Sequence, residues 1–181
     1  MPTQEQETIE KRVFVDMDRC IECGSCAAAC YYSHADMPAV QQARAGWALL
    51  PVICRQCKSA PCVDVCPAEA MVRDDQGVVR RRLFRCIGCG SCARACPFGV
   101  ITTTLGGTPV AWKSPDRLTG HQVAKCDLCA DRLSEHPDAV PRCVAACPAG
   151  ALVFVDARAA PAEGIKVVGG RTAAEDFYKR R

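Results

Sequence analysis

The sequence predicts an α+β protein of two tandem modules, one nested inside the other, built from short strands, short helices and groups of four cysteines. Three observations support this fold class. Sixteen cysteines fall into four quartets along 181 residues, and proline follows the last cysteine of three of them. Runs rich in β-branched and apolar residues lie just outside the first and the last quartet. Each predicted module therefore contains two of the four cysteine quartets.

The third quartet indicates what the cysteines bind. Its spacing is C-x2-C-x2-C-x3-C followed by Pro97, which is the spacing of a bacterial [4Fe–4S] ligand run. In two-cluster ferredoxins the fourth cysteine of such a run ligates the other cluster. The four quartets are Cys20, Cys23, Cys26, Cys30; Cys54, Cys57, Cys62, Cys66; Cys86, Cys89, Cys92, Cys96; and Cys126, Cys129, Cys143, Cys147. The sequence therefore predicts four [4Fe–4S] clusters in two bacterial 2[4Fe–4S] ferredoxin-like modules, with no spare thiol.

Zinc is the main alternative ligand for cysteine pairs of this kind. A structural zinc site takes four ligands, often as two separated pairs, and the fourth quartet alone would satisfy it. Zinc gives no reason for the triple C-x2-C-x2-C runs or for the repeated Cys-Pro. With only five Phe, three Tyr and two Trp, the chain also has a poor core unless inorganic clusters fill it.

Composition and charge limit which cellular compartment and which classes of partner are expected. Residues 1–10 are polar, and no run approaches the roughly 18 apolar residues of a membrane helix. We therefore expect a cytoplasmic protein with reduced thiols and no direct membrane span. The net charge of +3 counts the cysteines as neutral. Four clusters would add about −2 each and bring the total to about −5, so basicity gives no support for nucleic-acid binding.

Short elements are expected around the quartets, in chain order. Residues 12–17 and 151–155 are predicted strands that pair with each other, because each lies just outside an outermost quartet. Residues 70–73 and 78–82 flank a turn sequence at 74–77 and form a predicted hairpin. Residues 100–104 form another strand. A helical turn is predicted after each third cysteine, at 27–32, 63–66, 93–96 and 144–147.

Three segments lie outside this repeat. Residues 34–50 are expected to form a linker or a partner-facing loop, and residues 105–120 a second loop. Residues 158–181 form a predicted C-terminal tail that contacts a partner or stays mobile, because Ala, Gly and charged residues bury little surface. The predicted outer module comprises residues 1–50 plus 121–157, and the inserted inner module comprises residues 51–120.

Two pairings of the quartets are compatible with the spacing. In the sequential pairing, quartet one exchanges its fourth ligand with quartet two, and quartet three with quartet four. The short predicted hairpin between quartets two and three, and the longer gap from Cys30 to Cys54, favour a nested pairing instead. The nested ligand sets are Cys54, Cys57, Cys62 with Cys96; Cys86, Cys89, Cys92 with Cys66; Cys20, Cys23, Cys26 with Cys147; and Cys126, Cys129, Cys143 with Cys30.

The quartet order resembles that of the four-cluster iron–sulfur subunits of multisubunit oxidoreductases. The second quartet reads C-x2-C-x4-C-x3-C-P and the fourth C-x2-C-x13-C-x3-C-P, and the resemblance covers about residues 12–155. It implies nested ligand exchange and a catalytic partner. Such partners include molybdenum and tungsten enzymes (formate dehydrogenases, aldehyde oxidoreductases), hydrogenases and carbon monoxide dehydrogenase, with a tungsten aldehyde oxidoreductase preferred. Tyr31, in place of proline after Cys30, departs from the pattern.

These observations predict a non-catalytic subunit that relays single electrons between a catalytic subunit and another redox subunit or carrier. A flavin subunit and further copies of this chain are additional candidate partners. A free-standing polyferredoxin shuttle is the alternative, followed by a structural zinc protein. The basic run at residues 80–82 and 85 is either a solvated strand face or a docking site for an acidic partner. The three histidines are expected at the surface or in loops, not among the ligands.

Overall fold

The computed structural model describes residues 11–34, 39–105, 121–136 and 138–156. In these ranges the chain forms four two-stranded antiparallel sheets and several short helices. In chain order the elements are β1 (Lys11–Val15), α1 (Ser25–Ser33), β2 (Gln41–Ala45), β3 (Ala48–Val52), α2 (Pro61–Asp64), β4 (Met71–Arg73), β5 (Val79–Arg81), the 3-10 helix η1 (Leu83–Arg85), α3 (Ser91–Ala95), β6 (Thr102–Leu105), β7 (His121–Ala124), α4 (Ala130–Glu135), α5 (Arg142–Ala145) and β8 (Leu152–Asp156).

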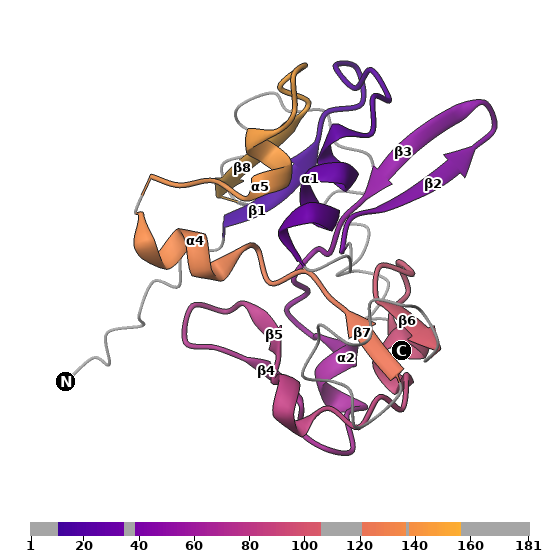
Figure 1. The fold of residues 1–181 in the computed structure, drawn as a ribbon, viewed down its shortest axis with the longest axis vertical. Coiled ribbons are helices and arrows are strands. Elements are labelled where there is room, and N and C mark those ends of the chain that lie inside the picture. The colour runs from indigo at the N-terminus through magenta and orange to yellow at the C-terminus, as the bar shows by residue number, and fades with distance from the viewer. Residues whose placement is uncertain (1–10, 35–38, 106–120, 137, 157–181) are drawn as a thin grey trace.

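The first and last strands close the fold. β1 pairs with β8 antiparallel, with Val13 opposite Phe154, and the ladder continues where the Asp16 N–H donates to the Ala151 carbonyl at 2.7 Å. α1 packs against α5 next to this sheet, and all four elements lie together in the upper half of Figure 1. The predicted pairing of residues 12–17 with 151–155 is therefore confirmed.

The predicted hairpin between quartets two and three is also confirmed. β4 pairs with β5, with Met71 opposite Arg81. The turn is held by Asp74, whose Oδ1 accepts the N–H groups of Gln76 at 3.1 Å and Val78 at 2.8 Å. Gly77 has φ 77°, a left-handed conformation that glycine adopts without a side-chain clash.

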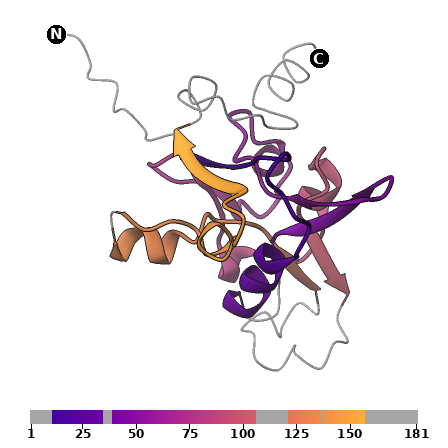
Figure 2. The same ribbon diagram turned by 90° about the horizontal axis from the view of Figure 1, so that it is seen from above.

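Residues 41–52 correct one expectation. The prediction of a linker or loop over residues 34–50 was wrong for most of this segment, because β2 and β3 form a hairpin there. Ala45 lies opposite Ala48, so Gly46 and Trp47 form a two-residue turn, with Gly46 at φ 62°. β2 contains no β-branched or aromatic residue, which is why its composition did not indicate a strand. The hairpin projects from the body of the protein in Figures 1 and 2.

The strand predicted at residues 100–104 is displaced to 102–105, where β6 pairs with β7, a strand that the sequence did not predict. The prediction also missed α4, which occupies the long gap of the fourth quartet. The segments 106–120 and 157–181, and with them most of the second predicted loop and the whole predicted tail, lie outside the described residues.

Cysteines form a large part of both buried cores. The first core groups Cys26, Cys30 and Cys143 with Ala39, Val40, Ile53, Ala151 and Leu152. The second groups Cys54 and Cys92 with Met71, Val100, Ile101 and Val123. Few large apolar side chains are present, so the packing of each core depends on what occupies the space between its cysteines.

Candidate metal centres

Three hollows that open to solvent are each lined by four cysteines. We name each hollow after its first cysteine from a triple. The Cys20 site is lined by Cys20, Cys23, Cys26 and Cys147; the Cys54 site by Cys54, Cys57, Cys62 and Cys96; and the Cys86 site by Cys86, Cys89, Cys92 and Cys66. Each hollow thus combines three cysteines of one quartet with the fourth cysteine of another.

We refer to the remaining four cysteines, Cys30, Cys126, Cys129 and Cys143, as the Cys126 site, and they line none of the three hollows. Burial raises the pKa of Cys143 to about 12, and the nearby Cys129 and Cys30 add to the shift. His34 links the two parts of this site, since its Nδ1 lies 3.7 Å from Cys30 Sγ and its Nε2 lies 3.8 Å from Asp127 Oδ1. Asp127 in turn accepts the Cys129 N–H at 2.9 Å.

A common backbone geometry shapes the four ligand loops. The residue just before the second cysteine has positive φ in every quartet: 58° at Glu22, 49° at Gln56, 68° at Gly88 and 61° at Leu128. The left-handed conformation costs a non-glycine residue about 1–2 kcal/mol. The third cysteine is the second residue of a short helix in every quartet, namely α1, α2, α3 and α5. Each loop therefore turns sharply and then fixes its third sulfur on a helix.

Burial and side-chain contacts compensate the strained positions. Leu128 is only 2% exposed, and Gln56 is only 1% exposed. Glu22 accepts the Leu49 N–H at 2.9 Å through Oε2. The loops are thus held in shape by contacts from elsewhere in the chain.

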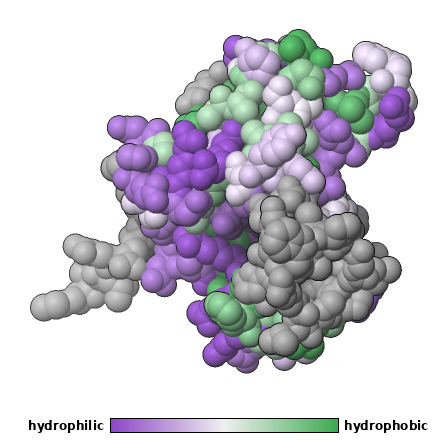
Figure 3. All heavy atoms as spheres, in the orientation of Figure 1, coloured by the Kyte–Doolittle hydropathy of each residue, from purple (hydrophilic) through white to green (hydrophobic). Residues whose placement is uncertain are grey.

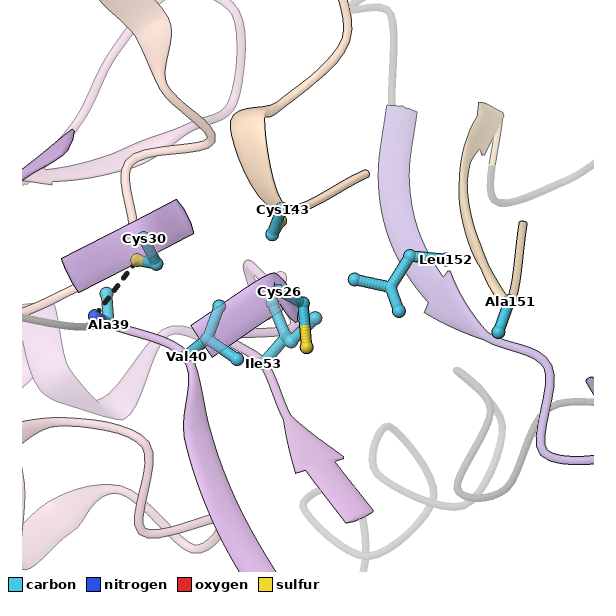
Figure 4. Packing of buried hydrophobic residues seen from close by; sticks show 8 residues of the cluster. All are labelled: Cys26, Cys30, Ala39, Val40, Ile53, Cys143, Ala151 and Leu152. Carbon is cyan, nitrogen blue, oxygen red and sulfur yellow. Dashed lines mark hydrogen bonds between the residues drawn. The ribbon is translucent and has the colours of Figure 1, made fainter. Parts of the chain in front are cut away.

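In three of the four quartets, a backbone N–H group donates a hydrogen bond to the sulfur of the last cysteine. Ala70 and Ala151 donate to the sulfurs of Cys66 and Cys147, both at 3.2 Å and both from four residues further along the chain. Cys30 receives its bond from Ala39 at 3.2 Å, nine residues on, because α1 continues through Tyr31 to Ser33 where the other quartets turn at proline. In Figure 4 the sulfurs of Cys26 and Cys30 point in different directions from this helix.

Gln56 and Lys125 join the Cys54 loop to the Cys126 loop. Gln56 Nε2 donates to the Cys126 carbonyl at 2.8 Å, and its Oε1 accepts the Val79 N–H at 2.9 Å. Lys125 Nζ donates to the carbonyls of Val79 at 2.6 Å and Cys126 at 2.7 Å. Lys125 Nζ also lies 3.6 Å from Cys54 Sγ. The two ligand loops are therefore connected through buried and half-buried polar contacts.

The thiols differ in their acidity. Burial raises the pKa values of Cys57 and Cys92 to about 11, whereas hydrogen bonds with Ser25 and Ser91 lower the pKa values of the exposed Cys23 and Cys89. Buried thiolates need compensating positive charge, which a bound metal core supplies. An all-sulfur donor set suits iron–sulfur clusters or zinc.

All sixteen cysteines are free of disulfides. Across the described ranges, no three His, Cys, Asp or Glu side chains are close enough to hold a single metal ion. Three of the four-cysteine sets instead surround hollows. This arrangement fits a multi-atom cluster held by four thiolates, which is the donor set of a [4Fe–4S] centre.

Comparison with known proteins agrees with this chemistry. Residues 45–157 match the 4Fe-4S dicluster domain family, and residues 19–70 match a second 4Fe-4S dicluster domain. The chain belongs to the 4Fe-4S dicluster domain family. Two dicluster domains and sixteen cysteines correspond to four [4Fe–4S] clusters, so the predicted cofactors are confirmed.

Several relatives of this dicluster protein are named as electron carriers. The electron transport protein HydN of Escherichia coli is 34% identical over 160 residues, covering 80% of this chain and 87% of HydN. The thiosulfate reductase electron transfer subunit PhsB of Salmonella typhi is 37% identical over 154 residues, covering 77% and 72%. The arsenate respiratory reductase iron-sulfur subunit ArrB of a Shewanella strain is 28% identical over 193 residues, covering 78% and 80%. The prediction of a non-catalytic iron–sulfur electron carrier is confirmed.

Sequence reasoning missed several residues that the structure brings to these sites. Gln56 carried no signal beyond its position before a second cysteine, and His34 was expected at the surface or in a loop although it contacts Cys30. His136 is exposed, as expected. The basic run is partly paired, with Arg80 2.6 Å from Asp74 and Arg85 3.6 Å from Glu69.

In the part of the chain that the structure describes, we find no helix with the length and apolar character needed to cross a membrane.

Proposed function

We propose that the chain relays single electrons between a catalytic oxidoreductase subunit and a second redox subunit or carrier, through four clusters with nested ligand sets. One observation supports this most strongly. Three hollows each combine the first three cysteines of one quartet with the fourth cysteine of the nested partner quartet. The β1–β8 sheet supports the same nesting, because it holds the first and last quartets together around the chain between them.

The proposed ligand sets are the Cys20, Cys54, Cys86 and Cys126 sites as defined above. They correspond to an outer module of residues 1–50 plus 121–157 and an inner module of residues 51–120. β7 lies at the junction, since Val123 packs in the core that contains Cys54 and Cys92.

Double substitution tests the ligand sets, because two ligands of one cluster fail together. The loaded chain should hold about 16 iron atoms. Cys96→Ala and Cys57→Ala should each leave about 12 iron atoms per chain, and their combination should still leave about 12. Cys96→Ala combined with Cys89→Ala should leave about 8, because these cysteines belong to different proposed sites.

The sequential pairing predicts that Cys96→Ala and Cys57→Ala remove two different clusters. About 8 iron atoms in that double variant would therefore reject the nested assignment. The opposite result for the pair Cys96 and Cys89, about 12 iron atoms, would reject it as well.

The catalytic partner is proposed from the relatives and from the surface. PhsB and ArrB are named as subunits of a thiosulfate reductase and an arsenate reductase. Large apolar side chains are exposed at ligand loops of this chain, with Ile21 at 64%, Ile87 at 57% and Phe84, close to Cys86, at 94%. Apolar patches also interrupt the hydrophilic surface in Figure 3. Aromatic and aliphatic residues at such positions are typical anchors of protein interfaces.

Within this proposal, a molybdenum or tungsten pterin enzyme is the preferred partner, with an aldehyde oxidoreductase or a formate dehydrogenase as the leading choices. A hydrogenase or carbon monoxide dehydrogenase, a flavin subunit and further copies of the chain follow. A cytoplasmic location is part of the proposal, because sixteen reduced cysteines suit a reducing compartment.

Anaerobic affinity purification from the native host tests the partner. We expect a large subunit to co-purify at a fixed ratio, with tungsten or molybdenum in the complex. A chain that emerges alone, loaded with iron, would support the polyferredoxin shuttle instead. A colourless chain with zinc in place of iron would reject both.

A further inference from the structure

The charged side chains that line the three hollows differ in sign and number. Among the described residues, Arg55 and Lys125 line the Cys54 site. Arg81 is the charged residue that lines the Cys86 site, and Glu22 is the one that lines the Cys20 site. Three sites with the same four-sulfur chemistry therefore differ in their lining charges: two cations at the Cys54 site, one cation at the Cys86 site and one carboxylate at the Cys20 site.

Lys125 is fixed against the Cys54 site. Its Nζ donates to the Val79 and Cys126 carbonyls at 2.6 and 2.7 Å and lies 3.4 Å from Gln56 Oε1. The same nitrogen lies 3.6 Å from Cys54 Sγ. Three oxygens thus hold the ammonium group next to the sulfur. A half-buried charge of this kind is screened by salt much less than one at the surface.

Arg55 is held by a different contact on the same site. Its guanidinium carbon lies 4.1 Å from the centre of the Phe98 ring, and both residues line the hollow. Stacking on the ring orients the guanidinium without neutralising it. The Cys54 site therefore has two positive groups, neither paired with a carboxylate by any contact among the described residues.

Glu22 gives the Cys20 site the opposite charge. Its Oε2 accepts the Leu49 N–H at 2.9 Å, and this bond comes from β3, outside the ligand loop. Arg19 precedes Cys20 but is exposed and does not line the hollow. The Arg19 guanidinium lies against Gly150 instead. Among the described residues that line this hollow, the charged one is therefore negative.

When bound, a [4Fe–4S] cluster takes up one electron and gives it back, which changes its charge with four thiolates from about −2 to about −3. A fixed cation stabilises the more negative state and a fixed carboxylate destabilises it. We propose that these wall charges rank the reduction potentials of the three hollows, highest at the Cys54 site, intermediate at the Cys86 site and lowest at the Cys20 site. This ranking rests on the proposed ligand sets.

The ranking has a functional meaning for the relay. Among the three ranked sites, electrons supplied in limited number collect at the Cys54 site, which lies within the proposed inner module and contacts the Cys126 loop through Lys125 and Gln56. Lys125 and Arg55 therefore act through their positive charges, which stabilise the reduced state of the Cys54 site, and neither contacts a substrate.

Anaerobic redox titration with electron paramagnetic resonance detection tests this on the loaded full-length chain, with dithionite as the electron donor. Lys125→Gln, which keeps a hydrogen-bond donor but removes the charge, should shift the couple of the Cys54 site to lower potential. Lys125→Arg should restore most of the shift. Glu22→Gln should shift a different couple to higher potential. Cys57→Ala and Cys23→Ala identify the two couples, because each removes one of them.

Lys58→Gln is the matched control, since Lys58 follows Cys57 in the same ligand loop but is exposed. It should leave every couple unchanged. No shift in Lys125→Gln, a shift of the same size in Lys58→Gln, or shifts of the same sign in Lys125→Gln and Glu22→Gln would overturn the proposal. Iron content separates this outcome from failure of the ligand sets, because all these charge variants should retain about 16 iron atoms per chain.

Discussion

Gln56 offers a quantitative test of how the ligand loops are held. This side chain is 1% exposed and bridges two backbone groups, the Cys126 carbonyl at 2.8 Å and the Val79 N–H at 2.9 Å. Gln56→Met keeps the length of the side chain but removes both hydrogen bonds. Each partner left without a bond costs about 1–3 kcal/mol, so we expect a loss of about 3 kcal/mol. If both bonds break before the unfolding transition state, unfolding should be about 150-fold faster.

The assay is anaerobic unfolding of the loaded protein in guanidinium chloride, followed by the loss of cluster absorbance near about 400 nm. Gln76→Met is the control, because Gln76 is exposed at the β4–β5 turn and the hydrogen bond in that turn uses its backbone N–H. The control should unfold within about twofold of the wild type. If Gln56→Met unfolds within twofold and also has an unchanged midpoint of unfolding, the two hydrogen bonds do not hold the loops together and the reasoning is refuted.

Three further predictions follow from the structure. Removal of iron with a chelator should unfold the chain, since cysteines form much of both cores, and far-UV circular dichroism would reveal a chain that instead keeps its helices. Asp127→Asn should destabilise the fold by about 1 kcal/mol. Hydrogen bonds to Asp127 and to two cysteines raise the pKa of His34 well above its usual value. The stabilisation from the charged imidazolium is complete below the unfolded pKa of about 6.5 and declines as the pH rises toward the raised value. Because unfolded His34 is the same in both proteins, the difference between the wild type and Asp127→Asn changes only where native His34 loses its proton. That difference should therefore persist from about pH 6 to about pH 9, and a difference that vanishes above about pH 7 in unfolding-rate measurements would contradict this assignment. Asp74→Ala should cost about 1–2 kcal/mol, because the Gln76 and Val78 N–H groups lose their acceptor. Unfolding rates equal to those of the wild type would argue against a role for this turn.

Local chemistry and chain order made part of the fold predictable. The β4–β5 hairpin follows from an Asp and a Gly at the positions where the turn needs them, and the β1–β8 sheet follows from strand signals outside the outermost quartets. β2 was missed because Gln41 and its neighbours lack strand propensity, and its pairing depends on a two-residue turn. Strand β7 was missed because its pairing with β6 is a tertiary contact.

The candidate sites show the same division. Cysteine spacing predicted the four ligand loops, since spacing is a local property of each loop, whereas the pairing of the quartets stays a prediction. The contacts of Gln56, His34 and Glu22 join segments far apart in the chain or depend on the orientation of a helix, and no local pattern encodes them. Their roles therefore emerged only from the folded arrangement.

The pairing of β1 with β8 also means that β1 is synthesised well before its partner strand. The ribosome releases β1 long before β8, and about 140 residues at 5–20 residues per second take about 7–28 s. Throughout that interval the edge of β1 has no partner strand, although the β4–β5 hairpin and the loops of quartets two and three have already been made. With the proposed nested ligand sets, the nascent chain passes through a stage in which quartets two and three can bind iron while quartet one still lacks the cysteines of quartet four. We expect cells that make this protein to protect the first quartet from oxygen until the last strand arrives.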